Sequence, residues 1–386
     1  MVDVPRALES VRNIEAASSW TLAPDGSVLT EESFQRTMAR ERKRTERSGR
    51  PFLLMLVDAS IGNSAEKCGK LLCGVISALA GTKRVTDVIG WYKKDIVVGV
   101  VFTEITAENK ALLLRVMLTR MSEALRNRLG IEHYNQITIS FHFFPEDWHH
   151  QAKHRPCNPT LYPDILKREE SKNGSRVFKR SIDVLGSTLA LLIFSPLFLF
   201  IAVAIKLTSK GPVLFRQQRV GQYGIPFTFL KFRSMYVNND DGNHKEYVRQ
   251  LIAGTARKQP SNGQKGNGEG VYKLTDDCRI TPLGRFLRRS SLDELPQVFN
   301  VLKGQMSLVG PRPSLPYEVT EYDLWHRSRL LEAKPGITGL WQVNGRNRLD
   351  FEEMVRLDLT YARTWSPWLD IKILLRTPRA VLEGAH

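Results

Sequence analysis

Residues 184–205 form an uncharged run of 22 residues, VLGSTLALLIFSPLFLFIAVAI. Asp183 precedes the run and Lys206 follows it. A straight helix of this length is about 33 Å long, close to the thickness of the hydrocarbon core of a bilayer. The alternative is a buried helix of a soluble core, but apolar residues occupy all faces of this segment. The sequence therefore predicts a membrane helix over residues 183–206.

Ser195 and Pro196 lie near the middle of this run. Because proline lacks a backbone N–H and clashes with the preceding turn, we expect a kink there, with the Ser195 hydroxyl bonding a freed carbonyl. Basic residues flank the run on both sides: Arg176, Lys179 and Arg180 before it, and Lys206, Lys210, Arg216 and Arg219 after it. Positive flanks remain in the cytoplasm. We therefore favour a re-entrant helix, which enters and leaves the same leaflet, over a crossing one, and we expect the first 170 residues to be cytoplasmic.

The composition limits the kinds of partner that the protein can have. The chain has 386 residues, enough for two or three domains, and 42% of them are hydrophobic. Lysine and arginine number 56 against 40 acidic residues, a net charge of +16, which predicts nucleic acid, an anionic membrane surface or a phosphorylated substrate as partner. Four cysteines without a C-x-x-C pair argue against a disulfide framework or a zinc ribbon. The first thirty or so residues lack an apolar run, so we expect no secretory signal.

Residues 31–150 are predicted to form an α/β domain after an N-terminal segment, 1–30, that is a tail or a docking segment. The patterns predict helices at 31–47, 69–80 and 109–128 and strands at 51–57, 97–102 and 137–144. Three stretches resemble a diguanylate-cyclase (GGDEF) domain: RSGRPFLLMLVD, DVIGWYKKDIVVGVV and ITISFHFFPED. KKDIV at 93–97 replaces the signature, and Ser60 stands where a second metal-binding aspartate is expected. The resemblance implies a degenerate GGDEF-like domain that serves dimerisation or regulation.

Two stretches are rich in proline, glycine and polar residues. Residues 151–177 are predicted to be a linker, and residues 238–270, which include KQPSNGQKGNGEG, a loop. The second domain then spans residues 178–386 and contains the membrane helix.

A dense block of charged residues covers 281–313, TPLGRFLRRSSLDELPQVFNVLKGQMSLVGPRP. Asp293 and Glu294 are adjacent, so on a helix their side chains point about 100° apart and cannot face each other. That arrangement suits a pair in which one carboxylate attacks while its neighbour holds a metal. Ser291 and Glu294 match an S-x-x-E capping box, which would place both acids in the first turn of a helix. The alternative is a capped helix whose acids are merely solvated.

Cations surround this acidic pair in the sequence. Arg285, Arg288 and Arg289 precede it, and the prolines beside Arg312 restrict the backbone there. Lys231 and Arg233, in LKFRSM, add further donors suited to phosphate. Aromatic residues do not alternate with these cations, as a groove for single-stranded nucleic acid requires. We therefore expect a phosphorylated substrate and no nucleic acid.

Several blocks together resemble the bacterial sugar transferase family of monotopic polyprenyl-phosphate phosphoglycosyl transferases. They are KRSIDVLGSTLALLIFSPLFLF, KFRSM, RRSSLDELPQ, NVLKGQMSLVGPRP, KPGITGLWQVNGR and DLTYARTWSPWLDIKIL, in order between residues 178 and 375. The resemblance implies a re-entrant membrane helix broken at Ser195 and Pro196, interfacial amphipathic helices and a small cytosolic catalytic domain. It also implies the transfer of a phosphosugar from a nucleoside diphosphate sugar to polyprenyl phosphate, which initiates bacterial surface glycan synthesis.

The same resemblance implies roles for single residues. Asp293 would be the nucleophile that forms a covalent phosphosugar intermediate, and Glu294 would help to bind Mg²⁺. Arg288 and Arg312 would contact phosphate, with Lys231 in the same set. Uridine is the expected nucleoside, whereas glucose, galactose and N-acetylated sugars remain open. The expected location is the cytoplasmic face of the bacterial inner membrane, in contact with lipid and with a homodimer as one possibility. The alternative is a membrane-tethered regulatory protein that has lost catalysis.

Overall fold

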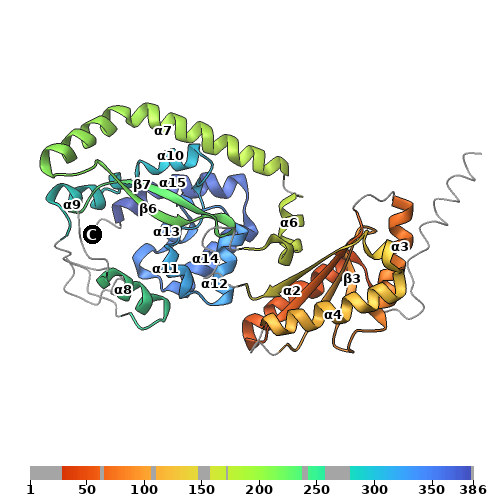
Figure 1. Ribbon diagram of the computed structural model, residues 1–386. Helices are drawn as coiled ribbons and strands as arrows, with labels where there is room; N and C mark the ends of the chain where they lie inside the picture. The colour runs from red at the N-terminus through yellow and green to blue at the C-terminus, as the bar shows by residue number, and fades with distance from the viewer. Residues whose placement is uncertain are drawn as a thin grey trace, which may run out of the picture. The chain divides into compact units, whose positions relative to one another are not determined.

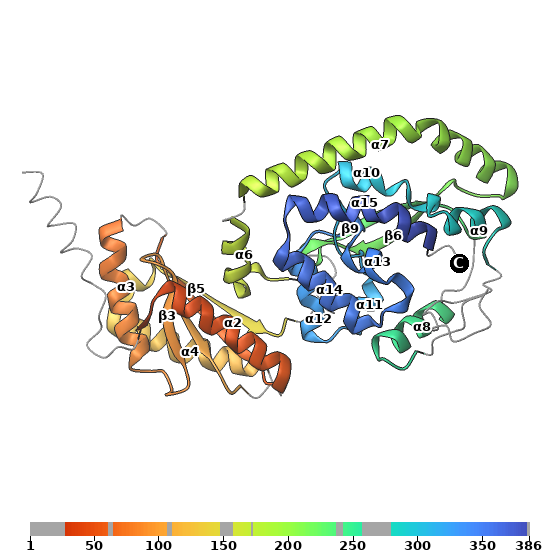
Figure 2. The same ribbon diagram turned by 180° about the vertical axis from the view of Figure 1, so that it is seen from behind.

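A computed structural model describes residues 28–60, 65–105, 110–146, 157–170, 173–236, 242–256 and 279–383. They divide into two compact units, one within Met1–Glu146 and Asn158–Asp164, the other within Asp147–Cys157 and Ile165–His386. Figure 1 and Figure 2 show the elements of each unit from opposite sides. The N-terminal segment predicted for residues 1–30 lies outside the described residues except for its last three.

The first unit contains a five-stranded sheet with helices on both faces. Its strands are ordered β1-β3-β4-β2-β5, and β2 pairs antiparallel with both β4 and β5. The strands are β1 (Val28–Leu29), β2 (Phe52–Asp58), β3 (Val88–Lys93), β4 (Val97–Phe102) and β5 (Thr138–Phe144), and the helices are α2 (Glu31–Ser48), α3 (Ala65–Ala80), α4 (Lys110–Leu129) and α5 (Ile131–Tyr134). The three predicted strands and three predicted helices are confirmed, whereas β3 was not predicted as a strand.

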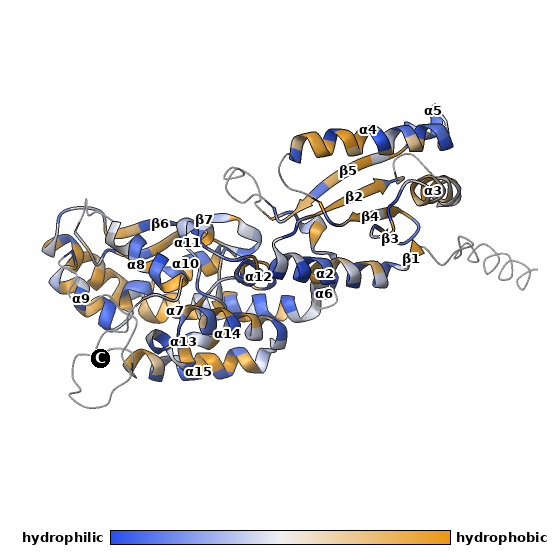
Figure 3. Cartoon of the chain, turned by 90° about the horizontal axis from the view of Figure 1, so that it is seen from below, coloured by the Kyte–Doolittle hydropathy of each residue, from blue (hydrophilic) through white to orange (hydrophobic). Residues whose placement is uncertain are grey.

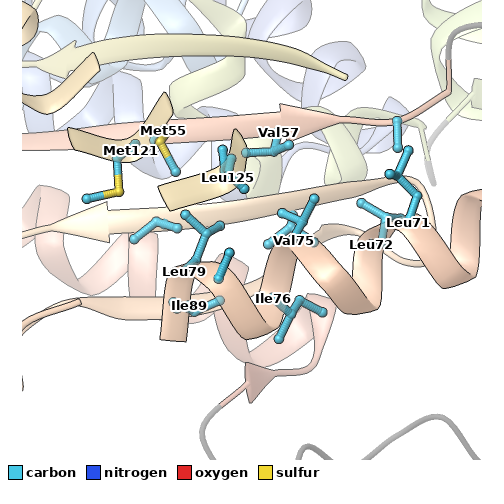
Figure 4. Packing of buried hydrophobic residues seen from close by; sticks show 14 of the residues in the cluster. Met55, Val57, Leu71, Leu72, Val75, Ile76, Leu79, Ile89, Met121 and Leu125 are labelled. Atoms are coloured by element: carbon cyan, nitrogen blue, oxygen red, sulfur yellow. The ribbon is translucent and has the colours of Figure 1, made fainter. Parts of the chain in front are cut away.

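Successive side chains of β2 point to opposite faces of the sheet, so they contribute to two hydrophobic cores, one on each face. Leu53, Met55 and Val57 pack with α3 and α4, as Figure 4 shows for part of that cluster. Phe52, Leu54 and Leu56 pack on the other side against α2. Paired glycines of β3 and β4, Gly90 and Gly99, make room for the ring of Phe34, because a Cβ on either would lie 2.6 Å from it. Both faces of the sheet are therefore covered.

The GGDEF-like prediction concerns the hairpin between β3 and β4. The order β2-α3-β3-β4-α4-β5 places residues 93–97, where the signature is replaced, at this turn. Asp95 adopts a left-handed backbone conformation there, with φ of 59°. The relation to GGDEF domains itself stays a prediction.

Part of the predicted linker is ordered. It contains η2 (Pro159–Leu161), α6 (Pro163–Glu170) and the beginning of α7 (Asn173–Thr208). Leu161 is fully buried in the α2-side core, and Arg42 binds its carbonyl oxygen through Nη1 at 2.6 Å and Asp164 Oδ1 through Nη2 at 2.6 Å. These contacts hold residues 158–164 on the first unit, so the proline-rich composition did not make them loose.

The second unit combines α7 with short helices and two small sheets. The antiparallel pair β6 (Leu214–Val220) and β7 (Pro226–Phe232) forms one sheet, and the parallel pair β8 (Ser307–Val309) and β9 (Gly336–Thr338) forms the other. The remaining helices are α8 (Gly242–Ile252), α9 (Pro282–Arg289), η4 (Leu292–Glu294), α10 (Gln297–Leu302), α11 (Pro316–Thr320), α12 (Leu324–Glu332), α13 (Leu340–Asn344), η5 (Arg346–Arg348), α14 (Phe351–Thr364) and α15 (Pro367–Glu383). A mixed α/β fold with one long apolar helix is therefore confirmed.

The loop predicted for residues 238–270 is wrong for residues 242–252, which form α8. Val248 is buried, and Leu251 and Ile252 pack against a core cluster of the second unit, so an apolar face fixes the helix. The segment KQPSNGQKGNGEG, residues 258–270, lies outside the described residues.

Within the described residues, one helix, Gly174–Thr208, is long and apolar enough to cross a membrane. Only 11% of its apolar window is buried, which argues against a helix in the core of a soluble protein. The helix continues through Pro196 and bows over the unit (Figures 1 and 2). Ser195 Oγ donates to the carbonyl oxygen of Leu192 at 3.0 Å, the acceptor that Pro196 cannot serve, which confirms the predicted compensation.

Helix α7 lies along the second unit, attached near both ends. Asp183 Oδ1 accepts hydrogen bonds from Ser307 Oγ and from the backbone N–H of Leu308, both at 2.9 Å. Far along the helix, Ile201 and Ile205 pack with residues of β7 and α9. The opposite side carries exposed apolar residues: Leu185, Leu189, Leu192, Ile193, Leu199, Phe200 and Val203. Helix α15 also exposes apolar residues. Figure 3 shows that this helix carries both hydrophilic residues, in blue, and hydrophobic residues, in orange.

Candidate active site

The site is assembled where α9 and η4 meet the end of β7. Thr281 caps α9 by accepting a hydrogen bond from the backbone N–H of Gly284 at 2.9 Å, and Pro282 occupies the first turn. A Cβ on Gly284 would lie 2.0 Å from the carbonyl oxygen of Ser234, so only glycine permits this approach. At the other end of the helix, Arg288 Nε donates to Ser234 Oγ at 2.9 Å. Two contacts thus fix α9 to the segment that follows β7.

Asp293 lies in η4 and is 7% exposed. Burial and the neighbouring Glu294 raise its pKa to about 6, against the opposing pull of Lys231 and Arg288. A carboxyl group of this pKa is mostly ionised at neutral pH, yet it has lost the solvation that stabilises an exposed carboxylate. Burial and nearby cations of this kind characterise carboxylates with a chemical task.

The pKa of Lys231, near the end of β7, is also shifted by burial and by the neighbouring charges. Burial lowers its pKa to about 8, and the positive charge of Arg288 adds to that effect, whereas Asp293 and Glu294 oppose it. Its ammonium lies 5.2 Å from the ring centroid of Phe215. The structure thus brings Lys231, Arg288 and Asp293 together, as the motifs predicted.

The predicted capping box at Ser291 is wrong. Ser291 has φ of 55° and ψ of 18°, its side chain makes no capping hydrogen bond, and the two acids lie in a 3₁₀ turn instead of the first turn of an α-helix. Ser291 Oγ accepts a hydrogen bond from Arg346 Nη2 at 3.1 Å. A left-handed conformation costs a serine about 1–3 kcal/mol, and such strain is concentrated at functional sites. Arg346 itself has φ of 49°.

Arg312 and Glu294 define the second side of the site. Arg312 Nη1 lies 3.3 Å from Glu318 Oε1, and its side chain is 43% exposed. Glu318, with help from Glu294, raises the pKa of Arg312. The prolines 311 and 313 hold the backbone of this arginine, as the sequence suggested, while the accepting carboxylate of Glu318 was not predicted.

Arg219 is the cation that the sequence did not assign to the site. Its Nη1 donates to the carbonyl oxygen of Pro313 at 2.9 Å, and the side chain is buried. Burial and Arg312 lower its pKa to about 10, whereas Glu318 and Glu294 oppose that shift. The sequence placed Arg219 only among the basic flanks of the membrane helix, because nothing local shows that β6 turns it toward residues 294 and 312.

Arg233 contacts the residue that directly follows α7. Its Nη2 donates to the carbonyl oxygen and to Oγ of Ser209, both at 2.7 Å, just beyond the end of α7. The side chain is buried, and its Nε and Nη1 have no hydrogen-bond partner among the described residues. The structure therefore shows Arg233 as a link between β7 and the membrane helix. Its predicted contact with substrate phosphate stays a prediction.

The donor set fits a magnesium ion bound together with a substrate. In the part of the chain that the structure describes, no three His, Cys, Asp or Glu residues gather in a way that could hold a metal alone. Mg²⁺ usually binds one or two carboxylates and completes its shell with water and substrate phosphates. Glu294 provides one such carboxylate next to Asp293, beside cations that suit phosphate oxygens.

Comparison with known proteins covers this half of the chain. The family model described as bacterial sugar transferase matches residues 174–384, more than half of the chain. The undecaprenyl-phosphate galactose phosphotransferase of Salmonella typhimurium is 42% identical over 225 residues, 57% of this chain and 44% of that protein. The UDP-glucose:undecaprenyl-phosphate glucose-1-phosphate transferase of Escherichia coli is 38% identical over 255 residues, 59% of this chain and 49% of that protein.

A shorter relative is matched over most of its length. The exopolysaccharide production protein ExoY of Rhizobium meliloti is 39% identical over 203 residues, 53% of this chain and 84% of that protein. The chain spans about half the length of the two longer relatives. Each of these relatives matches little more than half of this chain. The residues that the family model matches, 174–384, include α7 and the acidic pair.

Proposed function

The chain belongs to the bacterial sugar transferase family, and on that premise we propose that it transfers a phosphosugar from a nucleoside diphosphate sugar to undecaprenyl phosphate. Uridine is the proposed nucleoside, since relatives are named for UDP-glucose and UDP-galactose. The observation that carries the proposal is the buried carboxylate of Asp293, close enough to Lys231 and Arg288 for both cations to lower its pKa. This is the arrangement that a nucleophile for a negatively charged diphosphate requires, because the cations neutralise the substrate as the carboxylate approaches.

The chemistry takes two displacements at one phosphorus atom. A carboxylate oxygen of Asp293 attacks the sugar-bearing phosphorus and forms a P–O bond, while the bond to the bridging oxygen breaks and uridine monophosphate leaves with the electron pair. An oxygen of undecaprenyl phosphate then attacks the same phosphorus, and the aspartate departs as a carboxylate. The product is undecaprenyl diphosphosugar. Each half-reaction exchanges one P–O bond for another, so no redox partner is needed.

The cationic side chains of the site would bind and neutralise the phosphate groups of the substrate. Lys231 and Arg288 would bind oxygens of the phosphoryl group under attack, and Arg312 with Arg219 would face the group nearer Glu294. When bound with the help of Glu294, Mg²⁺ would neutralise the diphosphate and stabilise the departing nucleotide. The requirement for the metal is part of the proposal.

The placement of α7 supports catalysis at the membrane surface. A helix that crossed the bilayer would have to separate from the catalytic unit along much of its length, whereas α7 contacts it at Asp183 and again at Ile201. The exposed apolar side faces away from these contacts. We propose that α7 is re-entrant and that the enzyme lies on the cytoplasmic face of the inner membrane. There a lipid that cannot leave the bilayer meets a nucleotide sugar that cannot enter it.

We further propose that the first unit is a degenerate GGDEF-like domain that dimerises or regulates the enzyme. Its support is the helix-covered sheet with the antiparallel hairpin at residues 93–97. Light scattering of the full chain, with and without guanine nucleotides, tests this role. A monomer that does not respond to nucleotide would contradict it.

The test of the transferase proposal separates the two displacements. The purified full chain is incubated with Mg²⁺ and a radiolabelled UDP-sugar without acceptor, and both uridine monophosphate release and protein-bound label are measured. We expect about one equivalent of each, with the phosphosugar mass on the peptide that contains Asp293, and discharge of the label on addition of undecaprenyl phosphate. Asp293→Asn should give neither. Turnover without protein-bound label would refute the covalent route, and no turnover with any UDP-hexose or UDP-N-acetylhexosamine would refute the proposed activity.

A further inference from the structure

Two buried arginines anchor the backbone around Arg312. Arg329 Nη2, from α12, donates to the carbonyl oxygen of Arg312 at 3.3 Å, and Arg219 Nη1, from β6, donates to that of Pro313 at 2.9 Å. Arg329 is in turn paired with Asp358 of α14 at 2.6 Å, and both side chains are buried. The backbone of residues 312 and 313 therefore has a defined position.

These contacts fix the backbone but leave the side chain of Arg312 43% exposed. A carboxylate of α11 directs its guanidinium, because Arg312 Nη1 lies 3.3 Å from Glu318 Oε1. The other oxygen of that carboxylate, Oε2, accepts a hydrogen bond from the backbone N–H of Leu315 at 2.8 Å. The side chain of Glu318 is only 5% exposed. A carboxylate that the fold holds rigidly thus binds an arginine that reaches solvent.

Glu318 also compensates two like charges. Burial lowers the pKa of Arg219, and the charge of Arg312 lowers it further, whereas Glu318 opposes both. Burial would raise the pKa of Glu318, but the charges of Arg312 and Arg219 hold that pKa below its ordinary value. The carboxylate is therefore ionised at neutral pH and stabilises two guanidinium groups that repel each other.

Both arginines belong to the candidate active site, since the charge of Glu294 favours the charged form of each. We propose, on the basis of the proposed transferase function, that Glu318 is a positioning residue: it orients the guanidinium of Arg312 toward the diphosphate of the nucleotide sugar and keeps it beside Arg219. Bidentate binding of phosphate requires a defined direction of the guanidinium plane. Without its acceptor, the half-exposed side chain of Arg312 would sample several rotamers in solvent.

Glu318→Gln tests this role, because an amide cannot replace both acceptor oxygens. Its nitrogen would face a donor, either Arg312 or the backbone N–H of Leu315, and the negative charge is lost. We expect kcat/KM for the UDP-sugar that the wild type accepts to fall about tenfold. Glu321→Gln is the matched control, since the side chain of Glu321 is 39% exposed and pairs with Arg249 at 3.5 Å. This control should stay within about twofold of wild type.

A double-mutant cycle with Arg312→Gln separates positioning from damage to the fold. The full chain is studied in detergent with Mg²⁺, and both kcat/KM for the UDP-sugar and the affinity for uridine diphosphate, by calorimetry, are measured. In the Arg312→Gln background, Glu318→Gln should change neither quantity by more than about twofold, because the guanidinium that it orients is absent. Damage to the fold would lower both quantities in either background.

Wild-type values in Glu318→Gln, or equal losses with and without Arg312, would overturn the positioning role. Glu318→Asp keeps the charge but is one methylene shorter, so it decides the question where the amide does not fold. We expect a loss of at least about threefold in this variant, and unchanged kcat/KM and affinity would also overturn the role. Failure of the proposed function is observed separately, as a wild type that turns over no UDP-sugar. The cycle in uridine diphosphate affinity then still shows whether Glu318 orients Arg312.

Discussion

Replacing Asp293 with asparagine is expected to abolish transfer and to stabilise the protein at neutral pH. Burial and Glu294 raise the pKa of this carboxyl group from 3.8 to about 6, so ionisation disfavours the folded state. For an acid whose folded pKa is raised, stability is fully present below the unfolded pKa and is lost as the pH rises through the folded one. Asparagine keeps the shape without the charge and should avoid that loss.

The size of the effect follows from the same shift. A pKa raised from 3.8 to about 6 corresponds to at most about 3 kcal/mol of unfolding free energy at neutral pH. For a unit of this size, each kcal/mol moves the melting temperature by about 2–4 °C, so the increase should be at most roughly 6–12 °C. Thermal unfolding of the full chain in detergent at pH 4.5, 6.0 and 7.5 measures it, and the difference between variant and wild type should grow with pH.

Asp370→Asn is the matched control, because it makes the same change at a buried carboxylate with a structural role. Asp370 pairs with Lys179 at 2.7 Å and accepts hydrogen bonds from Tyr361 and Trp365. Breaking such a pair should destabilise by about 3–5 kcal/mol. If Asp293→Asn lowers the melting temperature at pH 7.5 as Asp370→Asn does, the carboxylate of Asp293 is a structural ion-pair partner and the reasoning is refuted. Transfer at the wild-type rate would refute its role as nucleophile.

Three further outcomes follow from the structure. The rate of nucleotide release should rise with pH through about 6, as Asp293 ionises, and fall through about 8, as Lys231 loses its charge; a pH–rate profile that stays flat from about pH 5 to about pH 9 would contradict both roles. Gly99→Ala should destabilise the first unit by about 1–3 kcal/mol in chemical unfolding, because the added Cβ meets the Phe34 ring, and unchanged stability would contradict that packing. Arg219→Gln should lower kcat/KM about tenfold or more, and wild-type kinetics would exclude Arg219 from the site.

The elements that the sequence predicted correctly are those with a strong local pattern. The uncharged run and the apolar strands β2 and β4 carry their own periodicity, so α7 and both strands could be placed. Strand β3, VIGWYK, mixes a glycine and a lysine with three large residues, and pairing with β4 fixes it instead of its own composition. Helix α8 was missed because only its amphipathic face, within a polar stretch, distinguishes it from a loop.

The residues of the candidate site also fall into those that local motifs predicted and those that depend on long-range packing. Asp293, Lys231 and Arg288 stand in motifs, so the resemblance placed them together, and the structure brings them together. Arg219 could not be found, because its approach to the acidic pair depends on how the β6–β7 hairpin packs against the backbone at Pro313. The capping-box prediction was also wrong because of a long-range contact. Arg346, far along the chain, binds Ser291 in its left-handed conformation, and this contact competes with the local cap.

The hydrogen bonds between Arg233 and Ser209 join the candidate active site to the end of α7. Arg233 lies two residues after Lys231, and its guanidinium holds the segment directly after α7, so a shift of that helix would be transmitted to the end of β7. The same strand end is packed against α7 through Phe232, which shares a core with Ile201 and Ile205. Because α7 is attached at several points along its length, the proposed re-entrant placement would let its exposed apolar side set the depth of this unit in the lipid. The acidic pair would then have a fixed height above the bilayer, which is the condition for a lipid-borne phosphate to reach a buried carboxylate.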